Sequence, residues 1–480
     1  MGMRKTKIVC TIGPATAAKL PNLIKAGMNV ARLNFSHGDY KEFNSWTKQI
    51  RSFDKSVGIL QDLAGPKIRV GKIDPKGMVL SVGDTVYLTT QEKANRPNEI
   101  PVNYKYLIQD VIEGESIYFA DGLLKVTVME KIKDRLRCKV DAGGVLYPEK
   151  GVNFPDSNLT VTSLTQKDKS DLEFGIKALD VDFIGLSFVR SASNIEELRG
   201  LISRLTKKKP WIISKIETKR SLDNIDDIIV ASDAIMVARG DLGVETPIAQ
   251  VPLLQKMLIA KSMAYLKPVI VATEMLNSMI SSPRPTRAEV SDVANAVFDG
   301  ADAVMLSGET AVGKFPIEAA KTLAEVVEVT ERSVLSSPIV DDGTVIRNTF
   351  SKKRKPLYRG VSIEESLSSA AVGLAFASHA KYIIVPTISG ATAKGVAAHR
   401  PVIEVIGFAS EQKLASQLSV VWGITAHVLS PARSTDLLFK SVISRLKKER
   451  KLISGDRVVV TAGHPVGGEG SSNIIKVIKI

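Results

Sequence analysis

The sequence is dominated by a rhythm of short apolar, β-branched segments, each followed by a stretch with helical character. Most segments begin roughly 20–35 residues apart, the length of one strand–helix unit. Near-continuous apolar runs are typical of strands buried on both faces of a parallel sheet. Eight such units predict a TIM (β/α)8 barrel, with strands at Ile8–Ile12, Val30–Leu33, Gly58–Gln61, Phe183–Ser187, Trp211–Ser214, Ala234–Val237, Val269–Ala272 and Ala303–Leu306.

The interval between the third and fourth segments is about 100 residues too long for one unit. Residues 68–163 fill it with short alternating segments, separated by turn-forming pairs such as Asp121-Gly122. This pattern predicts a small β-barrel lid domain, inserted in a TIM-barrel catalytic domain made of residues 1–67 and 164–338. Residues 339–360 are polar and are interpreted as a linker. Residues 361–480 are predicted to form a C-terminal open α/β regulatory domain, with strands at Tyr382–Pro386, Val402–Ile406, Ala426–Leu429, Arg457–Thr461 and Ile474–Ile478.

Composition narrows the class of protein. No run of about 18 or more apolar residues is present, so we expect no membrane-spanning helix. Cys10 and Cys138 are the only cysteines, which fits a reducing compartment such as the cytoplasm. The net charge of +14 favours anionic partners. Because no nucleic-acid-binding motif accompanies the basic runs, we expect small phosphorylated molecules rather than nucleic acid.

Polar and charged residues follow the predicted strands, where the active site of a TIM barrel lies. Glu217 and Asp241 follow neighbouring strands, which lie about 4.8 Å apart. Two carboxylates that close require a cation or a shared proton between them, and hard oxygen ligands suit Mg²⁺ or Mn²⁺. Salt bridges to Lys215 and Arg239 are the alternative interpretation. The residues at strand ends are Arg32, Asn34, Ser36, Asp62, Lys215, Glu217, Arg239, Asp241, Thr273, Ser307 and Glu309.

Two features indicate anion binding. Gly240 to Gly243 follow a strand and are predicted to open a helix, whose first amides form an anion site. Arg32 and Arg69 suit phosphate, because guanidinium is planar and always charged. The sequence has no GxxxxGK[ST] phosphate-binding loop, so nucleotide phosphates must be held in another way.

Four segments resemble the motifs of the pyruvate kinase family in order and spacing: Met28–Gly38 (MNVARLNFSHG), Ile212–Glu217 (IISKIE), Met236–Glu245 (MVARGDLGVE) and Ser282–Thr310 (with SPRPTRAE, DVANAV and LSGET). The resemblance extends over nearly the whole chain. It implies phosphoryl transfer between phosphoenolpyruvate and ADP, giving pyruvate and ATP. It also implies that the metal is Mg²⁺ and that the protein is a homotetramer.

The resemblance assigns roles residue by residue. Glu217 and Asp241 would hold Mg²⁺. Gly240, Asp241 and Thr273 would meet the substrate carboxylate or its surroundings, and Thr273 is placed in the proton path to carbon three. Arg32 would contact the substrate phosphate, and Lys215 would stabilise the migrating phosphoryl group. The nucleotide contacts implied by the resemblance are Asn34, His37, Arg69 and, from the lid, Lys150.

The sequence departs from the family pattern at several positions. Many members bind K⁺ with groups equivalent to Asn34, Ser36 and Asp62 and with a threonine hydroxyl, but here Leu63 stands in place of the threonine. Lys67 stands where K⁺-requiring members carry glutamate, so we expect that K⁺ is not required. Two further departures, Glu274 for glutamine and Ser191 for lysine, bear on nucleotide binding.

The C-terminal domain carries a candidate effector loop. A phosphate could be held there by hydroxyls and amides between a strand and a helix, and the family's effector loop has the same Thr-x-Ser-Gly-x-Thr/Ser character. Ala391 replaces a frequent arginine, and the Gly463–Gly470 segment could close over the ligand. We expect activation by a phosphorylated metabolite, and an ordinary strand–helix turn is the alternative. The loop residues are Thr387, Ser389, Gly390 and Thr392.

Three other functions compete with this interpretation. A metal-dependent barrel aldolase, or another enzyme of phosphoenolpyruvate or pyruvate, would share the acidic metal pair but need no nucleotide. A nucleic-acid-binding protein would need a basic reading element. A catalytically inactive homologue is disfavoured because Arg32, Lys215, Glu217, Asp241 and Thr273 are all present.

Overall fold

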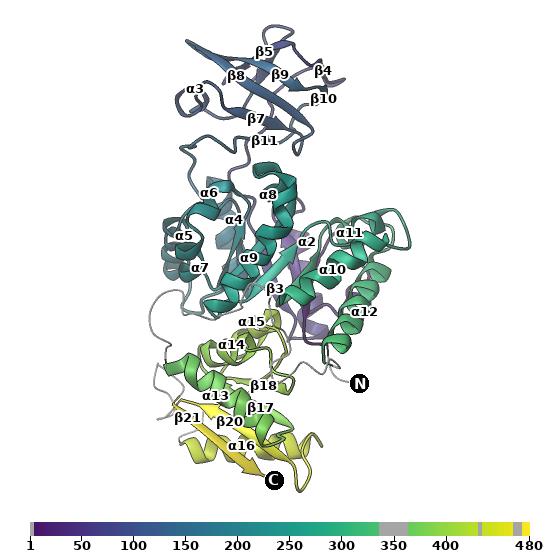
Figure 1. Ribbon diagram of the computed structural model, residues 1–480, viewed down its shortest axis with the longest axis vertical. Helices are drawn as coiled ribbons and strands as arrows, with labels where there is room; N and C mark the ends of the chain where they lie inside the picture. Colours follow the sequence, from purple (N-terminus) through teal and green to yellow (C-terminus); the bar gives the residue numbers. More distant parts are fainter. Residues whose placement is uncertain (1–3, 336–362, 431–433, 464–472) are drawn as a thin grey trace.

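The computed structural model describes residues 4–335, 363–430, 434–463 and 473–480. The predicted linker at residues 339–360 and nearly all of the Gly463–Gly470 segment therefore lie outside the described residues. Three domains follow one another along the long axis of the molecule in Figure 1, with the inserted domain at one end, the barrel in the middle and the C-terminal domain at the other end.

The central domain is a closed barrel of parallel strands in the order β1-β16-β15-β14-β13-β12-β3-β2. All eight predicted strands are confirmed, because long apolar runs can only be buried between the barrel interior and an outer layer of helices. The strands are β1 Lys7–Thr11, β2 Val30–Asn34, β3 Gly58–Asp62, β12 Phe183–Leu186, β13 Trp211–Ile216, β14 Ala234–Ala238, β15 Val269–Ala272 and β16 Ala303–Leu306.

Helices surround the barrel, and several begin at capping boxes that the sequence encodes. Asp39 and Glu42 cap one helix, and Thr286 and Glu289 cap another. The helices are α1 Leu20–Lys25, α2 Tyr40–Phe53, α4 Gln166–Lys177, α5 Ala192–Leu205, α6 Lys219–Asp223, α7 Ile225–Ala231, α8 Arg239–Glu245, α9 Val251–Ala264, α10 Arg287–Asp299, α11 Gly308–Ala311 and α12 Pro316–Leu335, with short 3-10 turns η1 Ile248–Gln250 and η2 Asn277–Ile280. None of the described helices is both long and apolar enough to span a bilayer.

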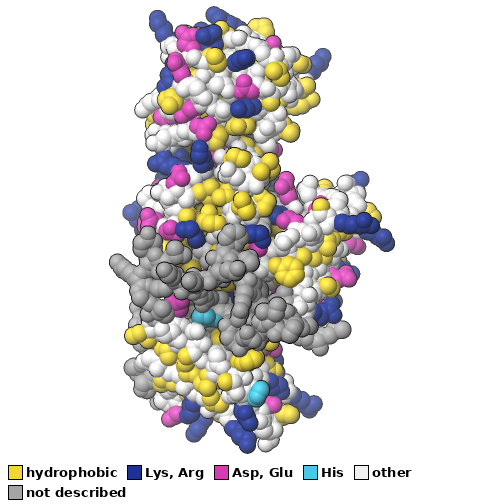
Figure 2. Space-filling view, in the orientation of Figure 1, with side chains coloured by type: hydrophobic (Ala, Val, Ile, Leu, Met, Phe, Trp, Pro, Cys, Tyr) yellow, Lys and Arg dark blue, Asp and Glu magenta, His cyan; other side chains and the backbone are white. Residues whose placement is uncertain are grey.

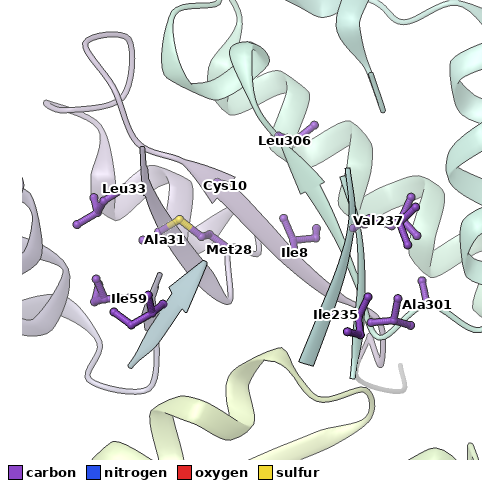
Figure 3. Close-up of a cluster of buried hydrophobic side chains, with 14 of the residues drawn as sticks. Ile8, Cys10, Met28, Ala31, Leu33, Ile59, Ile235, Val237, Ala301 and Leu306 are labelled. Carbon is purple, nitrogen blue, oxygen red and sulfur yellow. The ribbon is translucent and has the colours of Figure 1, made fainter. Parts of the chain in front are cut away.

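The apolar core of the barrel has two layers. Side chains between the strands and the helices form the outer layer, part of which is drawn in Figure 3 with Ile8, Met28, Ile59 and Val237 among its members. Side chains inside the barrel form an inner layer that continues without a break into the C-terminal domain. The C-terminal domain therefore shares its core with the barrel interior.

The inserted domain is a β-barrel, as predicted. Its main sheet has the order β11-β7-β8-β9-β5-β6. Residues 68–71 connect the two edges of this sheet, since the amide of Val152 donates to Ile68 and the amide of Gly71 donates to Pro101. The elements are β4 Met78–Leu80, β5 Thr85–Thr89, β6 Glu99–Pro101, α3 Leu107–Asp110, β7 Ser116–Phe119, β8 Leu124–Ile132, β9 Arg135–Ala142, β10 Gly144–Leu146 and β11 Val152–Asn153.

The C-terminal domain has a sheet in the order β19-β18-β17-β20-β21, parallel except for the last pair. Its second strand begins at Glu404 rather than at the predicted Val402, because the carbonyls of Pro401 and Val402 accept hydrogen bonds from Nζ of Lys5, each at 2.6 Å. The elements are α13 Ile363–Ala377, β17 Tyr382–Thr387, α14 Ala391–Ala398, β18 Glu404–Ala409, α15 Gln412–Gln417, η4 Leu418–Val420, β19 Ile424–Val428, α16 Thr435–Lys448, β20 Arg457–Ala462 and β21 Ile474–Lys479.

A buried ion pair joins the C-terminal domain to the barrel. Arg400 is 1% exposed and lies 2.8 Å from Asp302, which is 4% exposed. The amide of Trp422 donates to the same carboxylate at 3.0 Å. Because both charges are out of water, this contact fixes how the two domains meet.

Candidate active site

A cluster of alternating charges lies at the carboxyl ends of neighbouring barrel strands. Arg32 on β2 contacts Asp62 at the end of β3 through Nε at 2.7 Å and Nη2 at 2.6 Å. Nζ of Lys215 on β13 lies 3.3 Å from Asp62 and 2.9 Å from Glu217. The structure thus brings together four residues that the sequence placed at strand ends.

The cluster fixes the charge of its members. Burial opposes ionisation of Asp62, but the charges of Lys215 and Arg32 outweigh it and hold the pKa of Asp62 below its ordinary value. Burial also opposes the charge of Lys215, yet Asp62 and Glu217 raise the pKa of Lys215 overall. Lys215 is therefore a permanent cation at neutral pH, suited to charge stabilisation rather than to proton abstraction.

Glu217 is the residue most suited to a metal. Its side chain is 1% exposed, and its Oε2 accepts the amide of Phe188 at 2.7 Å. Its buried Oε1 accepts no hydrogen bond of regular geometry, although the Lys215 ammonium is near. Burial raises the pKa of Glu217, and the positive charge of Lys215 opposes this rise. The negative charge of Asp241 raises the pKa further, so the carboxylates of Glu217 and Asp241 are within electrostatic reach of each other.

A divalent cation between Glu217 and Asp241 would take Oε1 of Glu217, which faces the Lys215 ammonium at 2.9 Å, and would remove the repulsion between the carboxylates. Within the described ranges, no three acidic, histidine or cysteine side chains gather in a metal-binding arrangement. A metal at this place would therefore take two carboxylates from the chain, and other oxygens would complete its shell. That ligand set fits Mg²⁺, which keeps water or substrate oxygens among its ligands.

Thr273 follows β15 in an unusual backbone conformation. Its φ is +69°, a left-handed value that is rare for a β-branched residue. Its Oγ1 accepts the amide of Gly240 at 2.9 Å and donates to the carbonyl of Ala272 at 2.6 Å. Nη2 of Arg239 holds the carbonyl of Thr273 at 2.6 Å. These bonds maintain the conformation and set Thr273 against the first turn of α8, which carries Asp241.

Two residues at strand ends have their partners outside the charge cluster. Arg239 contacts Asp292 at 2.6 Å, so the alternative in which Arg239 neutralises the acidic pair is wrong, whereas the contact of Lys215 with Glu217 is present. Glu309 is 1% exposed, and its oxygens accept backbone amides of neighbouring loops at 3.1 and 2.7 Å. Its role is to fix these loops.

A cavity of about 450 Å³ lies between the inserted domain and the barrel. Arg69 and Lys150, two of the four predicted nucleotide contacts, line it together with Asp241. Arg69 also donates to the carbonyl of Glu149 at 2.7 Å. The other two predicted contacts, Asn34 and His37, are not among the lining residues. The structure therefore brings only part of the predicted nucleotide set to this cavity.

The residues predicted to replace a K⁺ site do not form one cluster. Leu63 is 1% exposed and packs in the outer core layer, and Oδ1 of Asn34 accepts the amide of Ser36 at 3.2 Å. Lys67 is exposed, lines the cavity and forms no ion pair with a carboxylate in the described part of the chain. Asp62 is already engaged by two other cations.

The loop after β12 contains functional residues that sequence reasoning missed. Ser187 accepts a hydrogen bond from Nζ of Lys215 at 2.7 Å, and the amide of Phe188 holds the buried carboxylate described above. Arg190 donates to two carbonyls of residues 159–161, where the chain returns from the inserted domain, each at 2.9 Å. The position of Ser187 as the last residue of the predicted strand Phe183–Ser187 was an available signal. The φ of +52° at Phe188 has no local signature.

The candidate effector loop packs against the barrel. Oγ1 of Thr387 accepts the amide of Gly390 at 2.9 Å, and Gly390 has a φ of +82° at the start of α14. A Cβ atom at Gly390 would lie 3.1 Å from the ring of Trp211, and Nζ of Lys394 lies 4.5 Å from the centre of that ring. Trp211 begins β13, the strand that carries Lys215. Ser389 is exposed.

Comparisons with known proteins agree over both major domains. The family model described as "Pyruvate kinase, barrel domain" matches residues 3–320, and "Pyruvate kinase, alpha/beta domain" matches residues 365–478. The chain is 42% identical to a pyruvate kinase of Geobacillus stearothermophilus and 41% identical to one of Bacillus licheniformis, covering 99% of this chain and 80% of each relative. A crystal structure of a pyruvate kinase from Cryptosporidium parvum superimposes with a TM-score of 0.89 at 35% identity, covering 99% of this chain and 96% of the other.

Proposed function

The chain belongs to the pyruvate kinase family, and from that premise we propose that the alternating charge cluster of the barrel carries out the family's reaction. The protein is a phosphotransferase that transfers the phosphoryl group of phosphoenolpyruvate to ADP and gives pyruvate and ATP. The observation behind the site assignment is the contact of Arg32, Asp62, Lys215 and Glu217 at the carboxyl ends of barrel strands. The relatives named above are pyruvate kinases, so they support this function and not the alternative, a metal-dependent aldolase.

Arg32 and Lys215 bind and neutralise the phosphoryl group. Phosphoryl transfer depends on in-line positioning and on cations that stabilise charge on the equatorial oxygens. Both side chains are nearly buried, at 11% and 12% exposure, so water screens their charges little. Gly240 and Asp241 lie where the substrate carboxylate would rest against the first turn of α8. Thr273 lies beside them, and its hydroxyl would have to leave the Ala272 carbonyl to take part in proton delivery.

Glu217 and Asp241 are the residues that would hold Mg²⁺, and Mn²⁺ has the same ligand preference. When bound, the ion would neutralise phosphoryl charge and polarise the enolate oxygen. Oε1 of Glu217, which is buried and lacks a hydrogen bond of regular geometry, supports this assignment. Lys215 contributes a second positive charge, 2.9 Å from Oε1 of Glu217.

The nucleotide is proposed to bind between the barrel and the inserted domain. Arg69 and Lys150 line the cavity there and offer positive charge to a polyphosphate. Asn34 and His37 would join them on closure of the inserted domain. Closure would also exclude water and limit hydrolysis of the phosphoryl group.

We propose that activity does not require K⁺. Leu63 offers no ligand oxygen, and Asp62 is held by Arg32 and Lys215. Lys67 is an exposed ammonium beside the cavity and has no ion-pair partner within the described residues, so its charge is available to the substrates.

Regulation is proposed for the loop that contains Thr387, Ser389, Gly390 and Thr392. The loop packs on Trp211 at the start of β13, so a phosphorylated ligand in the loop would act on β13 through this packing. A panel of sugar phosphates and AMP tests this proposal. Activation, or a rise in melting temperature, supports an effector site, and a panel that changes neither refutes it.

We also propose a cytoplasmic homotetramer that binds neither membranes nor nucleic acid. On the face shown in Figure 2, Lys and Arg side chains are scattered over all three domains and interspersed with Asp and Glu. A nucleic-acid interface would instead concentrate them along one stripe or groove. Sedimentation tests the oligomeric state, and a monomer at micromolar concentration would refute it.

The metal assignment is tested with Glu217→Gln and Asp241→Asn. Each variant should lose Mg²⁺-dependent pyruvate formation while its circular dichroism and melting temperature stay close to those of the wild type. Glu196→Gln, which removes an exposed charge from α5, is the matched control. Full activity of either site variant at saturating Mg²⁺ would contradict the assignment.

A further inference from the structure

Two buried hydroxyls contact the two cations of the site in the same way. Thr11, at the end of β1, is 3% exposed, and Ser187, directly after β12, is 2% exposed. Oγ1 of Thr11 accepts a hydrogen bond from Nη1 of Arg32 at 2.9 Å. Oγ of Ser187 accepts one from Nζ of Lys215 at 2.7 Å. Each cation thus has a neutral partner in addition to its carboxylate.

The proton of each hydroxyl is already committed to the backbone. Thr11 donates to the carbonyl of Leu306 at 2.9 Å, and Ser187 donates to the carbonyl of Leu63 at 2.8 Å. A hydroxyl has one proton and two lone pairs, so once the proton is engaged, only lone pairs face the cation. The hydroxyl orientation is therefore set by the barrel backbone.

The hydrogen bonds of each hydroxyl connect the two strands that flank the strand carrying it. β1 is paired with β16 and with β2, and β12 is paired with β3 and with β13. Thr11 connects the carbonyl of one neighbour with the cation of the other, and Ser187 repeats this arrangement. Asp62 lies between Arg32 and Lys215 and joins the two halves into one network.

We propose that Thr11 and Ser187 are positioning residues that fix the guanidinium of Arg32 and the ammonium of Lys215 for phosphoryl transfer. The proposal rests on the proposed function, in which these cations act on the phosphoryl group. A hydroxyl orients a cation without cancelling its charge, whereas a third carboxylate would lower the attraction for the substrate. Ser187 also remains available to Lys215 if the Glu217 oxygen is taken by a metal.

The kinetic test compares Thr11→Val, Thr11→Ser and Ser187→Ala, with Thr330→Val as control. Thr330 is also a buried threonine that donates to a carbonyl, but it lies on α12 and its hydroxyl contacts no cation among the described residues. Thr11→Val should raise KM for phosphoenolpyruvate about ten- to hundredfold, since hydrogen bonds to charged groups are strong. Ser187→Ala should lower kcat by a similar factor, because Lys215 is most needed in the transition state.

A purely structural role would give a different pattern. Loss of folded enzyme would lower kcat in both variants and leave KM unchanged. Thr11→Ser should restore most of the affinity lost in Thr11→Val, because it keeps the hydroxyl. If Thr11→Val and Ser187→Ala both stay within about twofold of wild type in both constants, the proposal is wrong.

Crystal structures of Thr11→Val and Ser187→Ala test the same proposal without turnover. The guanidinium and the ammonium should each move away from the vacated hydroxyl position, and unchanged positions would overturn the proposal. If the wild type fails to convert phosphoenolpyruvate and ADP while these groups move, the proposed function fails and the positioning role stands.

Discussion

Glu245 offers a quantitative prediction, because this ionisable group is partly buried where two domains meet. It lies at the end of α8, lines the cavity, and its Oε1 accepts a hydrogen bond from Asn153 of the inserted domain at 3.1 Å. Burial raises the pKa of Glu245 from 4.5 to about 7, against the hydrogen bond from Asn153 and with a further contribution from Asp241. The prediction concerns Glu245→Gln, which removes the charge and keeps an acceptor oxygen for Asn153.

The sign and size of the change in unfolding free energy follow from the linkage between protonation and folding. Below pH 4.5 the Glu245 carboxyl is protonated in both the folded and the unfolded chain, so it does not lower the free energy of unfolding. As the pH rises from 4.5 to about 7, the unfolded chain ionises first, and the free energy of unfolding falls by about 1.4 kcal/mol per pH unit. Above pH 7 the accumulated cost is about 3 kcal/mol. Glu245→Gln should therefore be the more stable protein at pH 8, and its advantage should vanish toward pH 4.5.

The assay is the thermal unfolding midpoint of both proteins in metal-free buffer between about pH 5 and 8. The difference between midpoints is the relevant quantity, because a protein of several domains does not unfold in two states. Glu196→Gln corrects for the general loss of one negative charge. A midpoint difference between wild type and Glu245→Gln that is the same at pH 5 and pH 8 would refute the reasoning.

Four further predictions concern the domain contact, Lys215 and the role of K⁺. Arg400→Met should destabilise the protein by about 3–5 kcal/mol, because it leaves Asp302 buried without its partner; a thermal midpoint equal to wild type would contradict this. Lys215→Met should lower kcat far more than it raises KM, and a change in KM alone would count against a transition-state role. Replacement of K⁺ by tetramethylammonium at constant ionic strength should leave turnover within about tenfold, whereas a loss of two orders of magnitude or more would be incompatible with K⁺ independence. The double variant Leu63→Thr with Lys67→Glu should lose activity without K⁺ and regain part of it when K⁺ is added.

The barrel strands and much of the site could be predicted from the sequence for a physical reason. A parallel strand buried on both faces needs a continuous apolar run, and the residue that follows it lies at the active-site end. This rule located Arg32, Asp62, Lys215, Glu217 and Asp241. It does not distinguish a catalytic side chain from one that fixes a loop, which is why Arg239 and Glu309 were grouped with them.

The rest of the site depends on contacts between residues far apart in the sequence. The hydrogen bond of Asn153 to Glu245 and those of Arg190 to the returning segment arise only when the inserted domain docks on the barrel. The positive φ of Phe188 is imposed by its surroundings. The packing of Gly390 on Trp211 likewise reflects the docking of the C-terminal domain. Local sequence patterns do not encode such contacts.

The most direct test of the account measures pyruvate and ATP together, from phosphoenolpyruvate with Mg²⁺, in the presence and absence of ADP. The account predicts one ATP for each pyruvate, no pyruvate without ADP, and loss of both products in Glu217→Gln. Pyruvate released without ADP, or formed at the wild-type rate by Glu217→Gln, would contradict phosphoryl transfer at this site.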